Sequence, residues 1–271
     1  MRLRELLYLL GWPRPAARSY GHEVVTFDLP DEGPVQFARW LHPNVLATTV
    51  RQEEVSALRA FLRPGDVVVD IGAHGGDTPV PFGLAVGPTG AVIAFEPNPY
   101  VFPVLAANAT LNRDKLRILP HCFAAAPEDG PLTFEYGDPG YCNGGRHEGY
   151  SRWRHGSVFE LQVDGVRLEP FLELHHPDLI DRIRFIKVDA EGFDRLILES
   201  IRGLIARTRP FLRTEMFKLA TRKQRLELLH TVTSMGYRVV RMRSDTDYVG
   251  EPLNEADVMA WKTFDLFCFP E

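Results

Sequence analysis

The most constraining feature of the sequence is an apolar run that ends in an acid and a glycine-rich turn. Residues 67–78 read Val-Val-Val-Asp-Ile-Gly-Ala-His-Gly-Gly-Asp-Thr. Glycines in such a turn let the backbone approach a ligand closely, and a helix after it offers unpaired N–H groups. The spacing is not the Gly-x-Gly-x-x-Gly of a dinucleotide site, because His74 stands in place of the second glycine. The stretch therefore predicts a strand-turn-helix unit that binds a ligand other than NAD.

The rest of the chain alternates short apolar runs with longer helical patterns. Helical patterns cover 51–62, 193–205 and 221–235, and the last has Thr221 and Gln224 in capping-box spacing. This alternation favours a parallel sheet with helices on both faces. The sequence therefore predicts an α/β fold with a doubly wound sheet of about seven strands. The expected strands are 67–70, 91–96, 116–119, 183–188, 211–214, 237–242 and 261–269.

Two parts of the chain depart from this alternation. Residues 1–50 read as an N-terminal extension, with a helix over 1–12 and a hairpin of strands 22–29 and 34–41. Residues 51–271 form the main domain. Within it, segment 127–170 breaks the pattern with glycines, prolines and aromatic residues. We expect this segment to be an insertion whose loops contact the substrate.

Composition narrows the classes of protein that this chain can belong to. The 31 lysines and arginines stand against 36 acids, a net charge of −5, which argues against a chain that mainly neutralises nucleic-acid phosphates. Three widely spaced cysteines support neither a disulfide framework nor a cysteine zinc site. No apolar segment reaches the length of a membrane-spanning helix, and 1–12 lacks the features of a signal peptide. We expect a soluble, cytoplasmic protein without stable membrane insertion.

A second acid follows one strand after the glycine-rich turn. The run 91–96 ends in Glu96, where an α/β fold positions a carboxylate to accept hydrogen bonds from ribose hydroxyls. Asn98 can cap the next helix, with Pro99 at its first position. A strand often ends in an acid for no functional reason, so Glu96 alone is weak evidence. Combined with the turn at 70–76, it predicts a nucleoside ligand.

At this point the motifs resemble those of the FkbM family of S-adenosylmethionine-dependent methyltransferases. The resemblance covers roughly 65–217 and rests on Asp-Ile-Gly-Ala at 70–73, Phe-Glu-Pro-Asn at 95–98, Asn-Gly-Gly at 143–145 and Ile-Lys-Val-Asp-Ala-Glu-Gly at 186–192. It implies a Rossmann-like class I methyltransferase fold, with seven strands of which the last is antiparallel, and O-methylation of sugar or natural-product hydroxyls. The chain departs from the family at His74, where asparagine is common, and prolines at 79 and 81 predict a short or irregular first helix.

The resemblance also implies roles for particular residues. It places the methionine moiety at Asp70 and the backbone of the turn, the ribose at Glu96 and the adenine edge near Cys122 and Phe123. The residues expected to bind S-adenosyl-L-methionine, or its product S-adenosyl-L-homocysteine, are Asp70, Gly72, Ala73, His74, Gly76, Glu96, Pro97, Asn98, Cys122, Phe123 and Asp189. The residues expected at the reacting methyl group are Asp189, Glu191 and Glu215.

Methyl transfer to an alcohol benefits from a general base, because an oxygen attacks poorly while it keeps its proton. Asp189 is the first candidate and Glu215 the second, with His147 and His155 of the insertion as imidazole alternatives. Glu191 has an equally good structural interpretation, as a cap of the helix that begins near Phe193. The three acids Asp189, Glu191 and Glu215 could instead gather a Mg²⁺ ion, but no ligand spacing favours this, and we predict no metal site.

The sequence thus favours an S-adenosylmethionine-dependent O-methyltransferase that acts on a small molecule or a glycan. N-methylation and a non-catalytic nucleoside-binding module are the alternatives. A nucleic-acid acceptor is disfavoured by the acidic balance, and a nicotinamide oxidoreductase by the broken glycine spacing. The identity of the acceptor and the oligomeric state cannot be read from these motifs.

Overall fold

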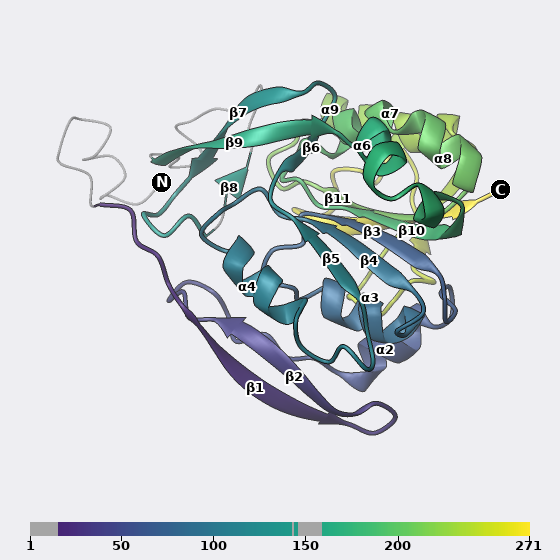
Figure 1. Ribbon diagram of the computed structural model, residues 1–271. Coiled ribbons are helices and arrows are strands. Elements are labelled where there is room, and N and C mark those ends of the chain that lie inside the picture. Colours follow the sequence, from purple (N-terminus) through teal and green to yellow (C-terminus); the bar gives the residue numbers. More distant parts are fainter. Residues whose placement is uncertain (1–15, 143, 146–158) are drawn as a thin grey trace.

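A central sheet of eight strands organises the molecule. The computed structural model describes residues 16–142, 144–145 and 159–271 (Figure 1). The sheet order is β13-β12-β14-β11-β10-β3-β4-β5, in which β5, β4, β3, β10 and β11 run parallel and β14 is antiparallel to both neighbours. The strands are β3 (Val67–Ile71), β4 (Ala91–Phe95), β5 (Ile118–His121), β10 (Ile183–Val188), β11 (Phe211–Met216), β12 (Tyr237–Arg241), β13 (Glu251–Pro252) and β14 (Phe264–Pro270).

This arrangement confirms the expected α/β fold with a doubly wound sheet and an antiparallel last strand. The sheet has one strand more than the seven expected, because the two-residue β13 adds to its edge. The chain fills the sheet outward from β3 to β5 and then returns to β10 on the other side of β3, so the order reverses between β3 and β10. In such sheets the ligand lies beyond the carboxyl ends of the strands at this reversal.

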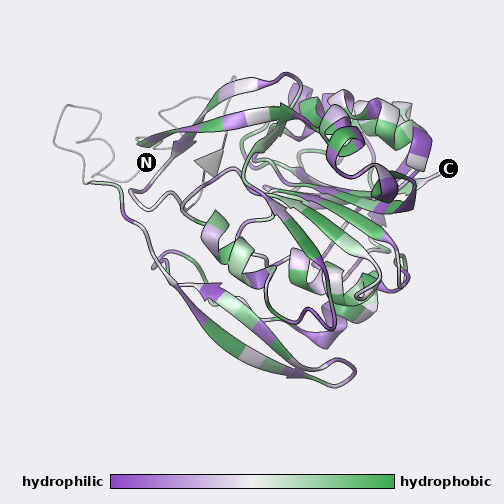
Figure 2. Cartoon of the chain, viewed as in Figure 1, coloured by the Kyte–Doolittle hydropathy of each residue, from purple (hydrophilic) through white to green (hydrophobic). Residues whose placement is uncertain are grey.

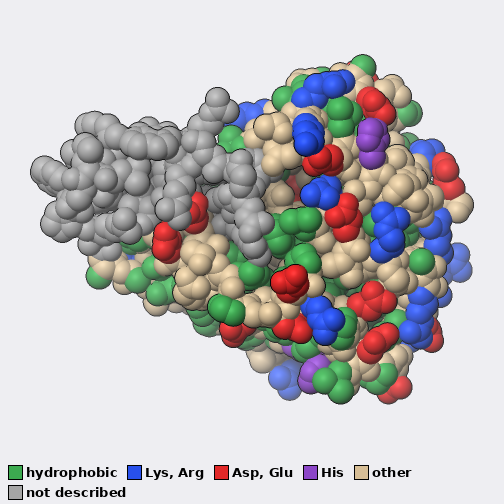
Figure 3. All heavy atoms as spheres, turned by 90° about the horizontal axis from the view of Figure 1, so that it is seen from above, with side chains coloured by type: hydrophobic (Ala, Val, Ile, Leu, Met, Phe, Trp, Pro, Cys, Tyr) green, Lys and Arg blue, Asp and Glu red, His purple; other side chains and the backbone are tan. Residues whose placement is uncertain are grey.

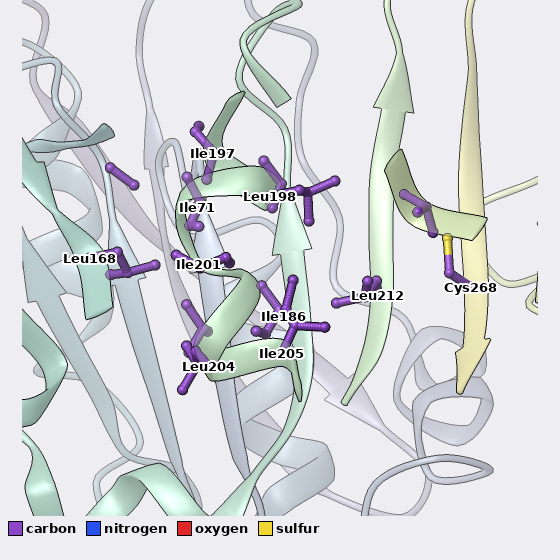
Figure 4. Close-up of a cluster of buried hydrophobic side chains, with 14 of the residues drawn as sticks. Ile71, Leu168, Ile186, Ile197, Leu198, Ile201, Leu204, Ile205, Leu212 and Cys268 are labelled. Atoms are coloured by element: carbon purple, nitrogen blue, oxygen red, sulfur yellow. The ribbon is translucent and has the colours of Figure 1, made fainter. Parts of the chain in front are cut away.

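Helices cover both faces of the sheet, and its strands are strongly hydrophobic (Figure 2). One face packs against α2, α3 and α4, and the other against α6, α7, α8 and α9. Figure 4 shows part of the second core, where Ile71 and Ile186 meet Leu168, Ile197 and Ile201. The helices are α2 (Gln52–Leu58), α3 (Pro79–Val86), α4 (Phe102–Asn108), α6 (Leu168–His175), the 3₁₀ helix η1 (Pro177–Arg182), α7 (Asp194–Ser200), α8 (Arg202–Thr208) and α9 (Arg222–Ser234).

Several element boundaries differ from the sequence prediction. The strand expected at 261–269 begins at Phe264, and the helix expected over 51–62 ends at Leu58. The expected helix over 193–205 is broken at Ile201 into α7 and α8, although its apolar spacing continues across the break. Strand β5 begins two residues later than expected, because Leu116 packs in the core before the strand starts. Helix α3 spans eight residues with Pro79 and Pro81 in its first turn, where a missing N–H leaves no intrahelical bond unmade.

The segment before the main sheet forms the expected hairpin. Strand β1 (His22–Leu29) pairs antiparallel with β2 (Gly33–Trp40), from His22 opposite Trp40 to Leu29 opposite Gly33. The hairpin packs its inner face on the core that also contains α2 and α3. The helix expected at 1–12 lies outside the described residues. The domain division at residue 50 stays a prediction.

The segment expected as an insertion of loops, 127–170, contains three strands of a second sheet, whose fourth strand β6 precedes it. The order of this sheet is β6-β9-β7-β8, with β6 (Ala124–Ala126), β7 (Gly130–Tyr136), β8 (Gly144–Gly145) and β9 (Phe159–Arg167). In β7 the residues Leu132, Phe134 and Tyr136 alternate with more exposed neighbours, so period-two hydrophobicity was a usable signal for this strand. None of the helices among the described residues combines the length and the apolar character needed to cross a bilayer.

Candidate active site

Two adjoining cavities lie at the carboxyl ends of the central strands. The larger measures about 580 Å³ and the smaller about 80 Å³. They meet at the reversal of strand order, as expected for a ligand site in a doubly wound sheet. The residues that line both cavities are Gly72, Glu96, Tyr136, Asp189 and Glu191. Four of these five were predicted from the sequence, and Tyr136 was not.

The glycine-rich turn is shaped by close backbone contacts. The N–H groups of Gly72 and Ala73 both donate to the carbonyl of Phe95, at 3.0 Å each. Gly72 has a φ of 81°, and a Cβ there would collide with the carbonyl oxygen of Asp189. His74 has a φ of 47°, a left-handed conformation that asparagine and histidine adopt more readily than most residues. Histidine at this position thus shares a backbone preference with asparagine, the residue that the resemblance led us to expect there.

Glu96 is held in place by backbone groups rather than by a cation. Its carboxylate accepts hydrogen bonds from the N–H of His74 and the N–H of Asn98, both at 2.9 Å. The side chain is buried, and this burial raises the pKa of Glu96, while the charge of His74 acts in the opposite direction. Each oxygen keeps lone pairs for further donors, so the group is suited to accept hydrogen bonds from ligand hydroxyls.

Asp70 lies behind the cavity wall instead of in it. Its carboxylate is fully buried and accepts a hydrogen bond from Thr78 Oγ1 at 2.6 Å and one from Lys187 Nζ at 3.2 Å. Burial raises the pKa of Asp70, and the charge of Lys187 opposes this effect. Thr78 and Lys187 both line the larger cavity, whereas Asp70 does not. A bound ligand would therefore meet Asp70 through these two side chains.

Lys187 is the site residue that sequence reasoning missed most clearly. Its ammonium group is buried and lies 3.2 Å from Asp70, 3.1 Å from the carbonyl of Gly72 and 3.5 Å from Asp189. Burial lowers the pKa of Lys187, but the charges of Asp70 and Asp189 outweigh it, so the net direction is upward and the ammonium stays charged. A buried lysine between the apolar residues Ile186 and Val188 was the available signal, because such a charge requires partners.

The loop after β10 presents Asp189 and Glu191 to both cavities. Glu191 and Gly192 have positive φ values of 51° and 100°, which makes the loop a tight turn. Fully buried Asp194 holds this loop to β11, since it accepts from the N–H groups of Ala190 and Gly192 and from Thr214 Oγ1. Burial raises the pKa of Asp194 to about 7.

Glu191 does not serve as the helix cap considered from the sequence. The N-cap of α7 is Phe193, which provides no side-chain cap bond, and Glu191 instead lies 3.8 Å from Lys218 Nζ. Burial raises the pKa of Glu191, with the charge of Lys218 opposing it. The position of Glu191 at the junction of the cavities suits it to face a ligand.

Glu215 lies apart from the other two acids. It lines a third cavity of about 340 Å³ between α7, α9 and the end of β11. One carboxylate oxygen accepts from Thr263 Oγ1 at 2.8 Å, and the other is buried without a hydrogen bond. Burial, followed by the charges of Asp189, Glu191 and Asp194, raises the pKa of Glu215 to about 8. The structure thus brings Glu215 within electrostatic reach of Asp189 but not into the same cavity.

The smaller cavity has an apolar wall that suits a flat heterocycle. Phe123 and Pro97 line it, as expected for the adenine edge. Cys122 is exposed and lines none of the three cavities. Ala73 and Gly76 are buried residues of the turn that line none of the three cavities, and Gly76 packs against Asn108. The alternative bases His147 and His155 lie outside the described residues.

The three acids considered as Mg²⁺ ligands do not gather. In the described part of the chain, one group of three metal-ligating side chains has donor atoms within 4.8 Å of one another, and it consists of His42, Asp138 and Cys142. The N–H of Asn44 donates to Nδ1 of His42, so the ring proton lies on Nε2 and points to Asp138 at 3.0 Å. A protonated nitrogen has no lone pair for a metal, and this group is therefore a closed hydrogen-bonded cluster.

Comparisons with known proteins point to one family. A family model described as the methyltransferase FkbM domain matches residues 70–239, more than half of the chain. No curated protein matches the chain at a significant level.

Solved structures resemble the chain at low sequence identity, at which the likeness concerns the fold alone. One is a methyltransferase FkbM from Methylobacillus flagellatus KT (18% identity, 76% of this chain, 44% of that chain, TM-score 0.45). Another is an S-adenosylmethionine-dependent O-methyltransferase from Thermotoga maritima (12%, 92%, 78%, 0.41). A third is fibrillarin from Aeropyrum pernix with natively bound S-adenosyl-L-methionine (11%, 93%, 96%, 0.43). The chain spans less than half the length of the first.

Proposed function

Because the chain belongs to the FkbM family of S-adenosylmethionine-dependent methyltransferases, we propose that it methylates a hydroxyl oxygen of a sugar, a glycan or a natural product. The observation that carries this proposal is the junction of the two cavities. An apolar cavity opens there into a larger polar one, and Glu96, Asp189 and Glu191 line both. A nucleoside in the first cavity would thus place its far end beside an acceptor in the second.

The residues present fit S-adenosylmethionine. The aromatic and proline side chains of the smaller cavity suit the adenine ring, and Glu96 can accept hydrogen bonds from the ribose. Gly72 lines both cavities, and its missing side chain lets the Asp189 carbonyl approach, which brings the loop after β10 against the turn. Thr78 and Lys187 line the larger cavity where the methionine moiety would lie. When bound, this cofactor supplies a methyl group carried on a positively charged sulfur.

Asp189 is the proposed general base. Its side chain is 46% exposed and lines both cavities, so a carboxylate oxygen is available to an acceptor hydroxyl. The ammonium of Lys187 lies 3.5 Å from this carboxylate and orients it through an ion pair. In the proposed step Asp189 would accept the proton of the acceptor hydroxyl, and the bound cofactor would supply the methyl group to the oxygen. Solvent then takes the proton from Asp189.

The walls of the larger cavity favour an uncharged or cationic acceptor over a nucleic acid. Among the described residues, the lysines and arginines that line it are Lys187 and Arg213, and each is shared between two acids. The acids that line the cavity are Glu54, Asp77, Glu96, Asp189, Glu191, Asp245 and Asp265. Lysine, arginine and acidic side chains are also interspersed on the described part of the face in Figure 3. Because the acids outnumber the paired cations among the described residues that line the cavity, we propose a small-molecule or glycan acceptor. A cytoplasmic location stays a prediction.

A binding and transfer experiment tests the proposal. Calorimetric titration should show binding of S-adenosylmethionine and S-adenosylhomocysteine and none of NAD. Transfer of labelled methyl should then be measured to hydroxyl-bearing and amine-bearing sugars and metabolites, with and without a chelator. Label on nitrogen would favour the N-methyltransferase alternative, and cofactor binding without transfer to any acceptor would favour a non-catalytic module. Binding of NAD alone would refute the proposal.

Two acids should separate in their effects. Asp189→Asn should lower single-turnover methyl transfer by roughly two to four decades with little change in cofactor affinity, because it removes a base. Glu96→Ala should instead weaken cofactor binding by about 1–3 kcal/mol, the range for hydrogen bonds to a charged group. Transfer rates at saturating cofactor, once an acceptor is found, check this. An unchanged rate in Asp189→Asn would contradict the assignment of Asp189 as the general base and make Glu191 the next candidate.

A further inference from the structure

Tyr136 is a buried side chain that the second sheet contributes to the active site. It is the last residue of β7, opposite Phe159 of β9, and its exposed fraction is 3%. The alternate residues Leu132, Phe134 and Tyr136 line the smaller cavity from one face of the strand. Tyr136 alone of these three also lines the larger cavity. Its ring therefore lies at the junction of the two cavities.

The hydroxyl of Tyr136 is a donor without a partner among the residues 16–142, 144–145 and 159–271 that the structure describes. It makes no hydrogen bond to any residue that the structure describes, although buried tyrosine hydroxyls usually find a partner. The ring is held by edge contact with Tyr141, at a centroid distance of 5.3 Å, and the backbone by the pairing of β7 with β9. Burial, and then the charges of Glu96 and Glu191, raise the pKa of Tyr136 well above its ordinary value. The hydroxyl therefore keeps its proton and can donate.

A ribose that donates its hydroxyl protons to Glu96 still needs a donor for the lone pairs of those hydroxyls. A ribose hydroxyl both donates and accepts, whereas an ionised carboxylate only accepts. The backbone N–H groups of His74 and Asn98, which lie against Glu96, already donate to its two oxygens. The lone pairs of a ribose bound there therefore require a donor from another element.

We infer that the hydroxyl of Tyr136 donates a hydrogen bond to a ribose hydroxyl of the bound nucleoside, beside Glu96. The inference rests on the proposed function, since it assumes a nucleoside cofactor in the smaller cavity. It makes the inserted sheet part of the cofactor site, through β7, as well as a neighbour of the acceptor. Glu96 and Tyr136 then bind the ribose together, Glu96 as the hydrogen-bond acceptor and Tyr136 as the donor.

The test compares Tyr136→Phe with the wild-type protein. The substitution removes the hydroxyl and keeps the ring, so the contact with Tyr141 is preserved. The control is Tyr141→Phe, a neighbouring buried tyrosine that lines none of the three cavities and whose hydroxyl interacts with Tyr100. Dissociation constants are measured by calorimetry for S-adenosylhomocysteine, adenosine, 2′-deoxyadenosine and 3′-deoxyadenosine, and thermal melting confirms that each variant is folded.

We expect Tyr136→Phe to weaken binding of S-adenosylhomocysteine and adenosine roughly two- to tenfold, the effect of one neutral hydrogen bond. The loss should vanish for whichever deoxyadenosine lacks the contacted hydroxyl, because the hydrogen bond is absent in both proteins. Tyr141→Phe should bind all four ligands like the wild type. Unchanged affinity in Tyr136→Phe, or an equal loss for adenosine and both deoxyadenosines, overturns the inference alone. Failure of the wild-type protein to bind any of the four overturns the proposed function as well.

Discussion

Lys187 joins two acids that come from different strands. It lies opposite Asp70 in the parallel pairing of β10 with β3, so both side chains emerge on the same face of the sheet. Asp189 follows two residues later in the chain, and its carboxylate lies 3.5 Å from the same ammonium. One buried cation thus fixes the wall behind the turn and orients the proposed base. Removing it would leave the fully buried Asp70 with Thr78 as its one remaining side-chain partner.

Lys187→Met should therefore destabilise the protein by about 3–5 kcal/mol, the cost of leaving a buried charge without its partner. The double variant Lys187→Met with Asp70→Asn should recover part of this loss, because it removes the orphaned charge. Urea unfolding at neutral pH measures both. Lys223→Met, at an 86% exposed side chain, is the matched control and should change the free energy of unfolding by less than about 0.5 kcal/mol. A similarly small effect for Lys187→Met would contradict the assigned role.

Between elements, two asparagines join the N-terminal hairpin to the last residue of α4 and to the turn that follows it. The side-chain amide of Asn108 accepts from the N–H of Ala38 (2.8 Å) and donates to its carbonyl (2.9 Å), and Asn112 pairs with Gln36 in the same way (2.9 and 2.7 Å). The two side chains take the place of a neighbouring strand along the free edge of β2. Asn108 also donates to the carbonyl of Gly75 at 2.7 Å. The hairpin is thereby connected to the glycine-rich turn.

Asn108→Ala should cost about 3 kcal/mol of stability, because it leaves buried backbone groups of Ala38 and Gly75 without partners. It should also weaken binding of S-adenosylhomocysteine, since the glycine-rich turn loses the hydrogen bond from Asn108 to the carbonyl of Gly75. The control is Asn112→Gly, which deletes the other side-chain amide. The φ of Asn112 is 51°, a conformation that glycine adopts without strain. Its partners are more exposed, so the loss should be about 1 kcal/mol with cofactor affinity unchanged. If the two substitutions changed cofactor affinity equally, the contact of Asn108 with the glycine-rich turn would have no specific effect on binding.

At the scale of the whole molecule, four acids converge from segments that are distant in sequence. Asp189, Glu191 and Asp194 follow β10, and Glu215 ends β11. Burial and mutual repulsion raise the pKa of Asp194 to about 7 and that of Glu215 to about 8. The folded protein therefore holds a proton on Glu215 that the unfolded chain releases near its ordinary pKa of 4.5. Ionisation of Glu215 costs stability, so this contribution weakens folding as the pH rises from 4.5 to 8.

Glu215→Gln cannot ionise and should escape this penalty. Its free energy of unfolding relative to the wild type should increase by about 2 kcal/mol between pH 5 and pH 8, less than the full linkage value because the group is partly exposed. Urea unfolding of both proteins at several pH values measures the difference. Glu173→Gln, at an exposed position on α6, is the control and should run parallel to the wild type. A pH-independent difference for Glu215→Gln would show that its pKa is not raised.

Much of the architecture followed from local sequence. The order of strands and helices, the glycine-rich turn and the capping box of α9 are set by hydrophobic period and backbone preference within a few residues. The boundaries of β5 and the break between α7 and α8 were missed, because they depend on what packs against Leu116 and Ile201. The strands of the insertion were missed although β7 alternates with period two.

Local patterns were enough to predict the fold class and the acids at the ends of the strands. Which of these groups face the cavities depends on contacts between distant segments. Asp70 lies behind Thr78 and Lys187 because the pairing of β3 with β10 puts a lysine opposite it. Glu215 lines a different cavity from Asp189. Tyr136 reaches the site because β7 pairs with β9, whose residue Phe159 is more than twenty residues away in the chain. Long-range register sets such surroundings, and no local pattern contains that information.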